Sequence, residues 1–203
     1  MTTGADDTSR SRQTTRLLSN SLATYGRMLI TVPLGLLATR FVLGALGTDD
    51  YGIFVVVGAA VGLVLVVDQA LVASSTRHLA YALGEGDPVD TAQTFNATFL
   101  FYAGFSAAVA IAAIPLENAL LSLISLPADR FGAAQFVFRM SIAATALSFL
   151  TAPWRAAIVA RQALVFNAVV GILNSSLLFA AAALAGSVGE DPLRSYSVLL
   201  FLA

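Results

Sequence analysis

Five long apolar stretches constrain this chain more than any other feature of its sequence. In chain order they are Leu17–Leu43, Tyr51–Ser74, Ala92–Pro115, Phe131–Ala152 and Leu164–Gly186. Each is long enough to cross a hydrocarbon core about 30 Å thick, which takes roughly 20 apolar residues in a helix. Lipid offers no partner to backbone polar groups, and the stretches lack the alternation of barrel strands. We therefore expect all five to be transmembrane helices.

A sixth apolar stretch begins at Leu193 and reaches the last residue, Ala203, after about half the length of a span. We therefore expect a truncated sixth helix at this end of the sequence. Residues 1–16 are polar and form a predicted cytoplasmic tail ahead of the helical region 17–203, and residues 44–50 form a predicted loop. The predicted fold class is all-α, a polytopic transmembrane helical bundle.

Composition supports a membrane protein and excludes several other classes. Hydrophobic residues make up 58% of the 203 residues and charged residues 11%, against about 45–50% and about 25% in soluble domains. The net charge of −1 gives no basic footprint for nucleic acid. One His and no Cys cannot assemble a metal cluster, and no phosphate-binding glycine loop or nucleophile motif is present. We expect no metal, no cofactor and no enzymatic activity.

Arginine placement predicts the orientation in the membrane. With the N-terminus in the cytoplasm, six arginines near helix ends lie inside and three lie outside. The inner ones are Arg10, Arg12, Arg16, Arg77, Arg155 and Arg161, and the outer ones are Arg40, Arg130 and Arg194. Because cytoplasmic loops carry the excess of basic residues, we expect a multi-pass protein with a cytoplasmic N-terminus.

The first apolar stretch carries a polar stripe on one helical face. Asn20, Thr24, Arg27 and Thr31 recur at spacings of 4, 3 and 4, which places them within a sector of about 80°. Arg27 lies roughly 15 Å deep, where an arginine costs at least about 2.5–3.5 kcal/mol. We expect the stripe to line the protein interior or a water-filled cavity. The alternative is that Arg27 pairs with a carboxylate on another helix.

Polar residues also interrupt the second and fifth stretches. Asn167 and Asn174 share one face of the fifth stretch. Asp68 lies near the predicted cytoplasmic end of the second. Asp68 either pairs with an arginine at that level, for which Arg77 and Arg155 are the candidates, or binds a coupling ion.

Several short segments, taken in order, resemble those of the polysaccharide biosynthesis flippases. The segment Leu46–Phe54, with the sequence LGTDDYGIF, resembles the loop and second-helix start of that family. Asp68–Arg77 is similar to its Asp-x-Gly-hydrophobic stretch, although Ala70 stands where Gly is usual. Segments similar to later parts of the family are Leu121–Pro127, Pro153–Gln162 and the Asn174 region. The resemblance covers Arg16–Ala203.

This resemblance implies the N-terminal lobe of a two-lobe transporter in the multidrug/oligosaccharidyl-lipid/polysaccharide exporter superfamily. It implies translocation of an undecaprenyl-pyrophosphate-linked oligosaccharide across the cell inner (cytoplasmic) membrane for cell-surface polysaccharide export. The implied partners are this glycolipid, the lipid bilayer, a C-terminal lobe and the polysaccharide assembly machinery. We expect Arg27 to contact the pyrophosphate through charge-assisted hydrogen bonds. The predicted polar lining around it is Asn20, Thr24, Thr31, Asn167 and Asn174.

Two alternatives stay open. A multidrug-type cation antiporter of the same superfamily would need a carboxylate inside the membrane, and Asp68 is the weak candidate for that ion-coupling site. A truncated, non-transporting membrane fragment would show the same helices up to Ala203.

Overall fold

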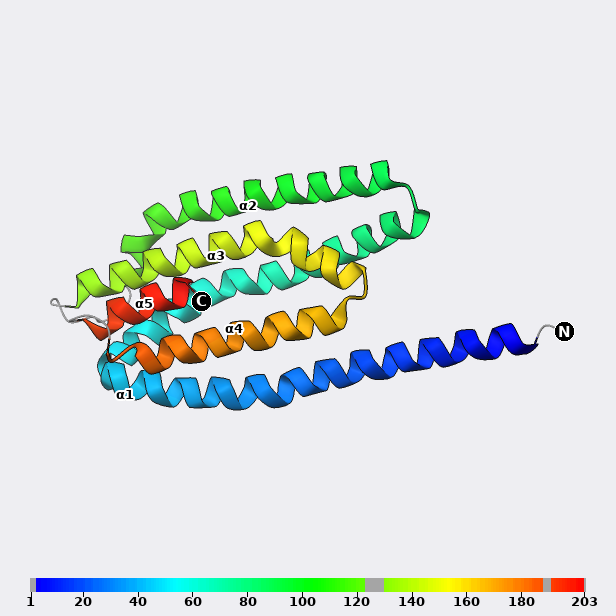
Figure 1. Ribbon diagram of the computed structural model, residues 1–203. Helices are drawn as coiled ribbons and strands as arrows, with labels where there is room; N and C mark the ends of the chain where they lie inside the picture. Colours follow the sequence, from blue (N-terminus) through cyan, green and yellow to red (C-terminus); the bar gives the residue numbers. More distant parts are fainter. Residues whose placement is uncertain (1–2, 123–129, 188–190, 203) are drawn as a thin grey trace.

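The chain folds into an all-helical bundle within the residues described by the computed structural model. These are residues 3–122, 130–187 and 191–202, with side chains described from Ser21 onward. The elements are α1 (Thr3–Glu85), α2 (Pro88–Ser122), α3 (Phe131–Ala160), α4 (Leu164–Leu184) and α5 (Pro192–Leu202). They run back and forth along one common direction (Figure 1).

The longest element, α1, doubles back on itself at Gly47 (Figure 1). Gly47 has φ 76° and ψ 177°, a combination that is essentially restricted to glycine. The chain therefore reverses direction at a single non-helical residue, in place of the loop predicted at residues 44–50. We call residues 3–46 the first limb of α1 and residues 48–85 the second limb.

The expectation of five complete helices and a truncated sixth was wrong for the described residues, which form five helical elements. The difference arises because the first two predicted helices join through Gly47 into the single element α1. The short element α5 begins at Pro192, next to the predicted start at Leu193. The backbone of residues 3–16, predicted as a polar tail, continues the first limb as helix.

Most helices run beyond the apolar stretches that predicted them. α3 and α4 start at the predicted residues, Phe131 and Leu164. However, α2 continues through Pro115, and α3 continues through Pro153. A proline removes one backbone hydrogen bond, but neighbouring helices of a membrane bundle satisfy the freed carbonyl, so the helix need not end.

Two buried clusters hold the bundle together. The larger one joins α1, α2, α3, α4 and α5 near the Gly47 end, and its members include Val42, Val57, Leu121, Val137, Ala185 and Leu193. The smaller one consists of Tyr102, Phe149 and Ala152, packed against Leu71 and Phe105. These clusters fix how α1, α2 and α3 face one another at two levels of the bundle.

The outer surface of the bundle is strongly apolar. Leu22, Leu29 and Leu36 on the first limb are 72%, 77% and 71% exposed, and their spacing of seven residues places them on one face. α1 from Ser21 onward, α2, α3 and α4 are long and apolar enough to cross a membrane. Leucine side chains left this exposed are stable against lipid rather than water, so the chain is a multi-pass membrane protein.

Candidate functional site

The side chain of Arg27 packs against the backbone of α4 at Gly171. A Cβ atom built on Gly171 would lie 2.8 Å from Arg27 Cδ and 3.1 Å from Arg27 Nη1. A side chain at position 171 would displace the end of the Arg27 side chain, so glycine lets the guanidinium lie directly on the helix as it does here. This contact brings together the polar face predicted on the first helix and the one predicted on the fifth.

The first limb of α1 and α4 run side by side in the same direction (Figure 1). Gly171 lies against Arg27 at one end, and Gly186 lies against Ala45 at the other, where a Cβ on Gly186 would be 3.3 Å from Ala45 Cβ. Residue numbers therefore rise together along both helices.

Four of the predicted lining residues lie on the same side of this contact. Thr24 and Thr31 lie about 60° and about 40° around the first limb from Arg27. Asn167 and Asn174 lie about 40° and about 60° around α4 from Gly171, in the opposite rotational sense. Because the two helices are parallel and face each other, opposite senses correspond to one common side.

That common side faces the rest of the bundle. Val42, which is buried in the larger cluster, lies about 60° from Arg27 in the same sense as Thr24. The exposed Leu22, Leu29 and Leu36 lie on the opposite face of the limb, about 140–180° from Arg27. The polar stripe therefore faces inward and the leucine stripe outward. The side chain of Asn20 lies outside the described residues.

Polar side chains on this inward side differ in exposure. Thr24 and Asn174 are exposed, whereas Arg27, Thr31 and Asn167 are half-buried. Within the described residues Arg27 has no carboxylate partner, so the alternative that it pairs with an acidic residue on another helix is not found there. Its charge is available to a ligand.

The depth of Arg27 follows from its contact with α4. Gly171 comes seven positions after Leu164, the first residue of the 21-residue α4. At 1.5 Å per residue, Arg27 lies about 10 Å inside the end of that helix. This is shallower than the roughly 15 Å estimated from the first apolar stretch alone. Arg27 lies ten residues after the start of that stretch, whereas Gly171 lies only seven residues after the start of α4.

Asp68 forms a buried ion pair that joins α1 to α3. Its Oδ2 accepts a hydrogen bond from Arg155 Nη2 at 2.8 Å, and its side chain is 2% exposed against 39% for Arg155. The same Nη2 donates to the Ser148 carbonyl at 3.2 Å. Arg155 is one of the two partners that the sequence predicted for Asp68, and the coupling-ion role stays a prediction.

The pair is incompletely satisfied within the described residues. Asp68 Oδ1 and Arg155 Nε are buried and have no hydrogen-bond partner there. Tyr102 and Phe149, both fully buried, pack at the same level of the bundle. The buried Asp68 carboxylate is therefore stabilised mainly by Arg155, so loss of the arginine should be costly.

Sequence reasoning missed a second ion pair between α2 and α3. Arg139 Nε donates to Glu117 Oε1 and Oε2 at 3.1 and 3.0 Å, and Nη2 lies 2.9 Å from Oε1. Glu117 is 11% exposed, and Arg139 is 64% exposed. The sequence prediction ended the third stretch at Pro115, which left Glu117 outside a helix and hid the pairing.

A third group of charges ties three elements together at the Gly47 end. Arg130, just before α3, lies 3.0 Å from Asp50 of α1 and 3.8 Å from Asp191, which precedes α5. Asp191 Oδ1 also accepts a hydrogen bond from the Leu193 backbone N–H at 3.1 Å, and this caps α5. In the sequence, Asp50 belongs to the acidic residues before Tyr51, and Asp191 belongs to the turn before Pro192. Neither pattern indicates that Arg130 is the partner of these carboxylates.

Metal binding has no candidate in the part of the chain that the structure describes. There, no three or more His, Asp or Glu side chains are grouped so that they could hold an ion. At the polar contact between α1 and α4, the threonine and asparagine side chains offer hydrogen-bonding groups and Arg27 offers one positive charge.

The fold and these contacts define the class as an all-helical, multi-pass membrane protein with an arginine-bearing polar contact between two of its helices. Comparisons of the chain with family models, with curated proteins and with solved structures find no match.

Proposed function

We propose that this chain translocates an undecaprenyl-pyrophosphate-linked oligosaccharide across the membrane for cell-surface polysaccharide export. The observation that carries the proposal is Arg27, which lies against Gly171 about 10 Å inside the end of the apolar α4 and has no carboxylate partner among the described residues. An arginine inside the membrane is costly. A guanidinium forms strong, paired hydrogen bonds to phosphate oxygens, so a pyrophosphate headgroup would offset that cost.

The neighbouring polar residues support a sugar-bearing substrate. Thr24, Thr31, Asn167 and Asn174 share one inward side of the α1–α4 contact, and two of them are exposed. Hydroxyl and amide groups both donate and accept hydrogen bonds, as sugar hydroxyls do. With Asn20, one turn before Thr24, they would give the glycan a polar path that lipid cannot provide.

The orientation and a partner lobe belong to the same proposal. A cytoplasmic N-terminus places the α1–α4 contact in the inner half of the bilayer, where a glycolipid made in the cytoplasm would enter. A second lobe outside this chain would close the path on its open side, and rocking of the two lobes would expose the site to each leaflet in turn.

A multidrug-type cation antiporter is less well supported. Such a transporter needs a carboxylate that exchanges an ion, and the candidate was Asp68. One oxygen of Asp68 is held by Arg155 Nη2 at 2.8 Å, so an incoming cation would compete with a positive charge already in place.

Translocation is tested with the purified chain in liposomes that contain a fluorescent undecaprenyl-pyrophosphate-linked oligosaccharide. A membrane-impermeant quencher reports how fast the label changes leaflet. Arg27→Ala should slow the exchange at least about tenfold, because a charge-assisted hydrogen bond contributes about 1.5–3 kcal/mol and 1.4 kcal/mol is a factor of ten. Arg27→Lys should keep part of the rate, and the matched control Arg77→Ala, an exposed arginine, should keep all of it.

The outcomes separate the alternatives. An unchanged rate in Arg27→Ala, at equal protein content and equal helicity by circular dichroism, would remove the phosphate role of Arg27. Exchange of a cationic drug against protons without glycolipid movement would favour the antiporter. No transport of either substrate by the unmodified chain would favour a non-transporting fragment.

A further inference from the structure

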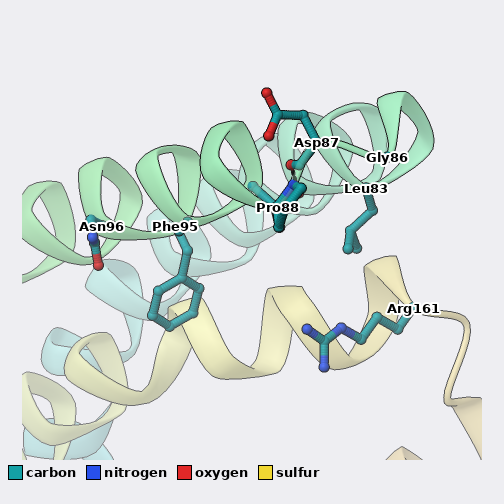
Figure 2. A pocket seen from close by; sticks show the side chains of 9 residues that line it. Leu83, Gly86, Asp87, Pro88, Phe95, Asn96 and Arg161 are labelled. Carbon is teal, nitrogen blue, oxygen red and sulfur yellow. Dashed lines mark hydrogen bonds between the residues drawn. The ribbon is translucent and has the colours of Figure 1, made fainter.

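A cleft of about 580 Å³ opens between α2 and α3 at the end of the bundle far from Gly47. Its walls include Leu83 from the second limb of α1, Phe95 and Asn96 from α2, and Arg161 directly after α3 (Figure 2). The volume lies within the range of about 300–1,000 Å³ that is typical of small-ligand sites.

Arg161 supplies an unneutralised positive charge to this cleft. It is exposed and lines the cleft, with its side chain running along the end of α3 (Figure 2). Among the described residues Arg161 has no carboxylate partner, although four other arginines do: Arg130, Arg139, Arg155 and Arg194.

The one acidic residue in the wall of the cleft is directed elsewhere. Asp87 Oδ1 accepts a hydrogen bond from the Val89 backbone N–H at 2.8 Å and thereby caps α2. Its carboxylate points to the side of α2 away from Arg161 (Figure 2). The cleft therefore presents the positive charge of Arg161 and the uncharged amide of Asn96 to a ligand. The Asp87 carboxylate does not neutralise the arginine.

Aromatic side chains beside the cleft are of the kind that is enriched at a membrane–water boundary. Phe95 projects toward α3 (Figure 2) and packs edge-on against Trp154, with ring centroids 5.6 Å apart. Trp154 is 50% exposed and also packs against Phe99 at 5.4 Å. Tryptophan is enriched where hydrocarbon meets headgroups, and Arg161 lies one residue beyond the end of the apolar α3.

We propose that this cleft binds the headgroup phosphate of an anionic phospholipid. The Arg161 guanidinium bonds the phosphate oxygens, and the acyl chains lie along Phe95 and the exposed face of Trp154. Basic clefts between membrane helices bind anionic headgroups in this way. The site lies apart from the α1–α4 contact and does not depend on the proposed transport function.

Trp154 makes the proposal directly measurable, because it is the only tryptophan of the chain. The chain is reconstituted in bilayers in which either phosphatidylglycerol or phosphatidylcholine carries brominated acyl chains, at equal mole fractions. Bromine quenches tryptophan fluorescence only at close range, so the two quenching curves give the relative affinity for the anionic lipid beside Trp154. One basic residue near an anionic headgroup predicts about a fivefold preference for phosphatidylglycerol.

Arg161→Gln should reduce this preference to about one, while Arg77→Gln, which removes an exposed arginine outside the cleft, should leave it unchanged. Added inorganic phosphate should not alter the quenching, because a soluble ion lacks the acyl chains. Equal quenching by both lipids, or a preference that survives Arg161→Gln, would overturn the proposal. Displacement of the brominated lipid by millimolar phosphate would instead identify a soluble-phosphate site and overturn it too. Circular dichroism of each variant shows that the helices are intact.

Discussion

The two partners of the Asp68–Arg155 pair should differ in what their removal costs. Arg155→Met leaves a carboxylate that is 2% exposed without the one cation that pairs with it among the described residues. Asp68→Asn removes that buried charge and leaves a guanidinium that is 39% exposed and still bonded to the Ser148 carbonyl at 3.2 Å. The arginine variant should therefore be the less stable of the two, although both lose the same ion pair.

The magnitudes follow from what each variant leaves behind. An uncompensated buried charge costs about 3–5 kcal/mol, which we expect for Arg155→Met. Asp68→Asn replaces a charged acceptor by a neutral one and should cost at most about 1.5–3 kcal/mol, the value for complete loss of a hydrogen bond to a charged group, because its partner reaches solvent. The double variant Asp68→Asn/Arg155→Met has no unpaired buried charge, so its loss should fall short of the sum by at least about 1 kcal/mol.

The free energy of unfolding is measured by titrating the protein from a mild detergent into dodecyl sulfate and following helicity by circular dichroism. Arg77→Met, at an exposed arginine, is the matched control and should change little. The reasoning is refuted if Asp68→Asn proves as destabilising as Arg155→Met, or if the two losses add fully in the double variant.

Three further predictions use the same unfolding measurement. Gly47→Ala should lower the free energy of unfolding by about 1–3 kcal/mol because φ at Gly47 is 76°, although a Cβ there has open space. Gly44→Ala, in helical backbone with equal space, should raise it by up to about 1 kcal/mol. Similar effects at both positions would contradict this. Ser106→Ala should cost about 0.5–1.5 kcal/mol through the loss of its 3.0 Å hydrogen bond to a backbone carbonyl of α3, and no loss would show that the bond contributes nothing. Arg139→Ala should be more destabilising than Glu117→Ala because the carboxylate is 11% exposed and the guanidinium 64%; the reverse order would argue against burial as the cause.

The positions of the membrane helices could be predicted well from apolar length. The starts of α3 and α4 at Phe131 and Leu164 match the predicted stretches, because a change from polar to apolar residues is a local signal. The ends were predicted less well. α2 and α3 continue through Pro115 and Pro153, since proline is tolerated inside membrane helices.

The candidate site was only partly accessible to sequence reasoning. Helical spacing placed Thr24, Arg27 and Thr31 on one face, but it could not show which helix that face meets. The spacing of Asn167, Gly171 and Asn174 puts Gly171 on the polar face of the fifth stretch, but it does not indicate that Arg27 lies on this glycine. That choice depends on the parallel packing of the first limb of α1 against α4.

What the sequence determined by itself is the class of protein: apolar stretches of span length must lie in lipid as helices, because only helices satisfy their own backbone there. Only the tertiary structure decided the pairing of charges. Asp68 meets Arg155 across 87 residues of chain, and Arg77 was an equally good partner on sequence grounds. A local pattern fixes the face of a helix on which a charge lies. Its partner depends on which faces pack together, and that is set by the burial of Tyr102, Phe149 and Ala152 between α1, α2 and α3.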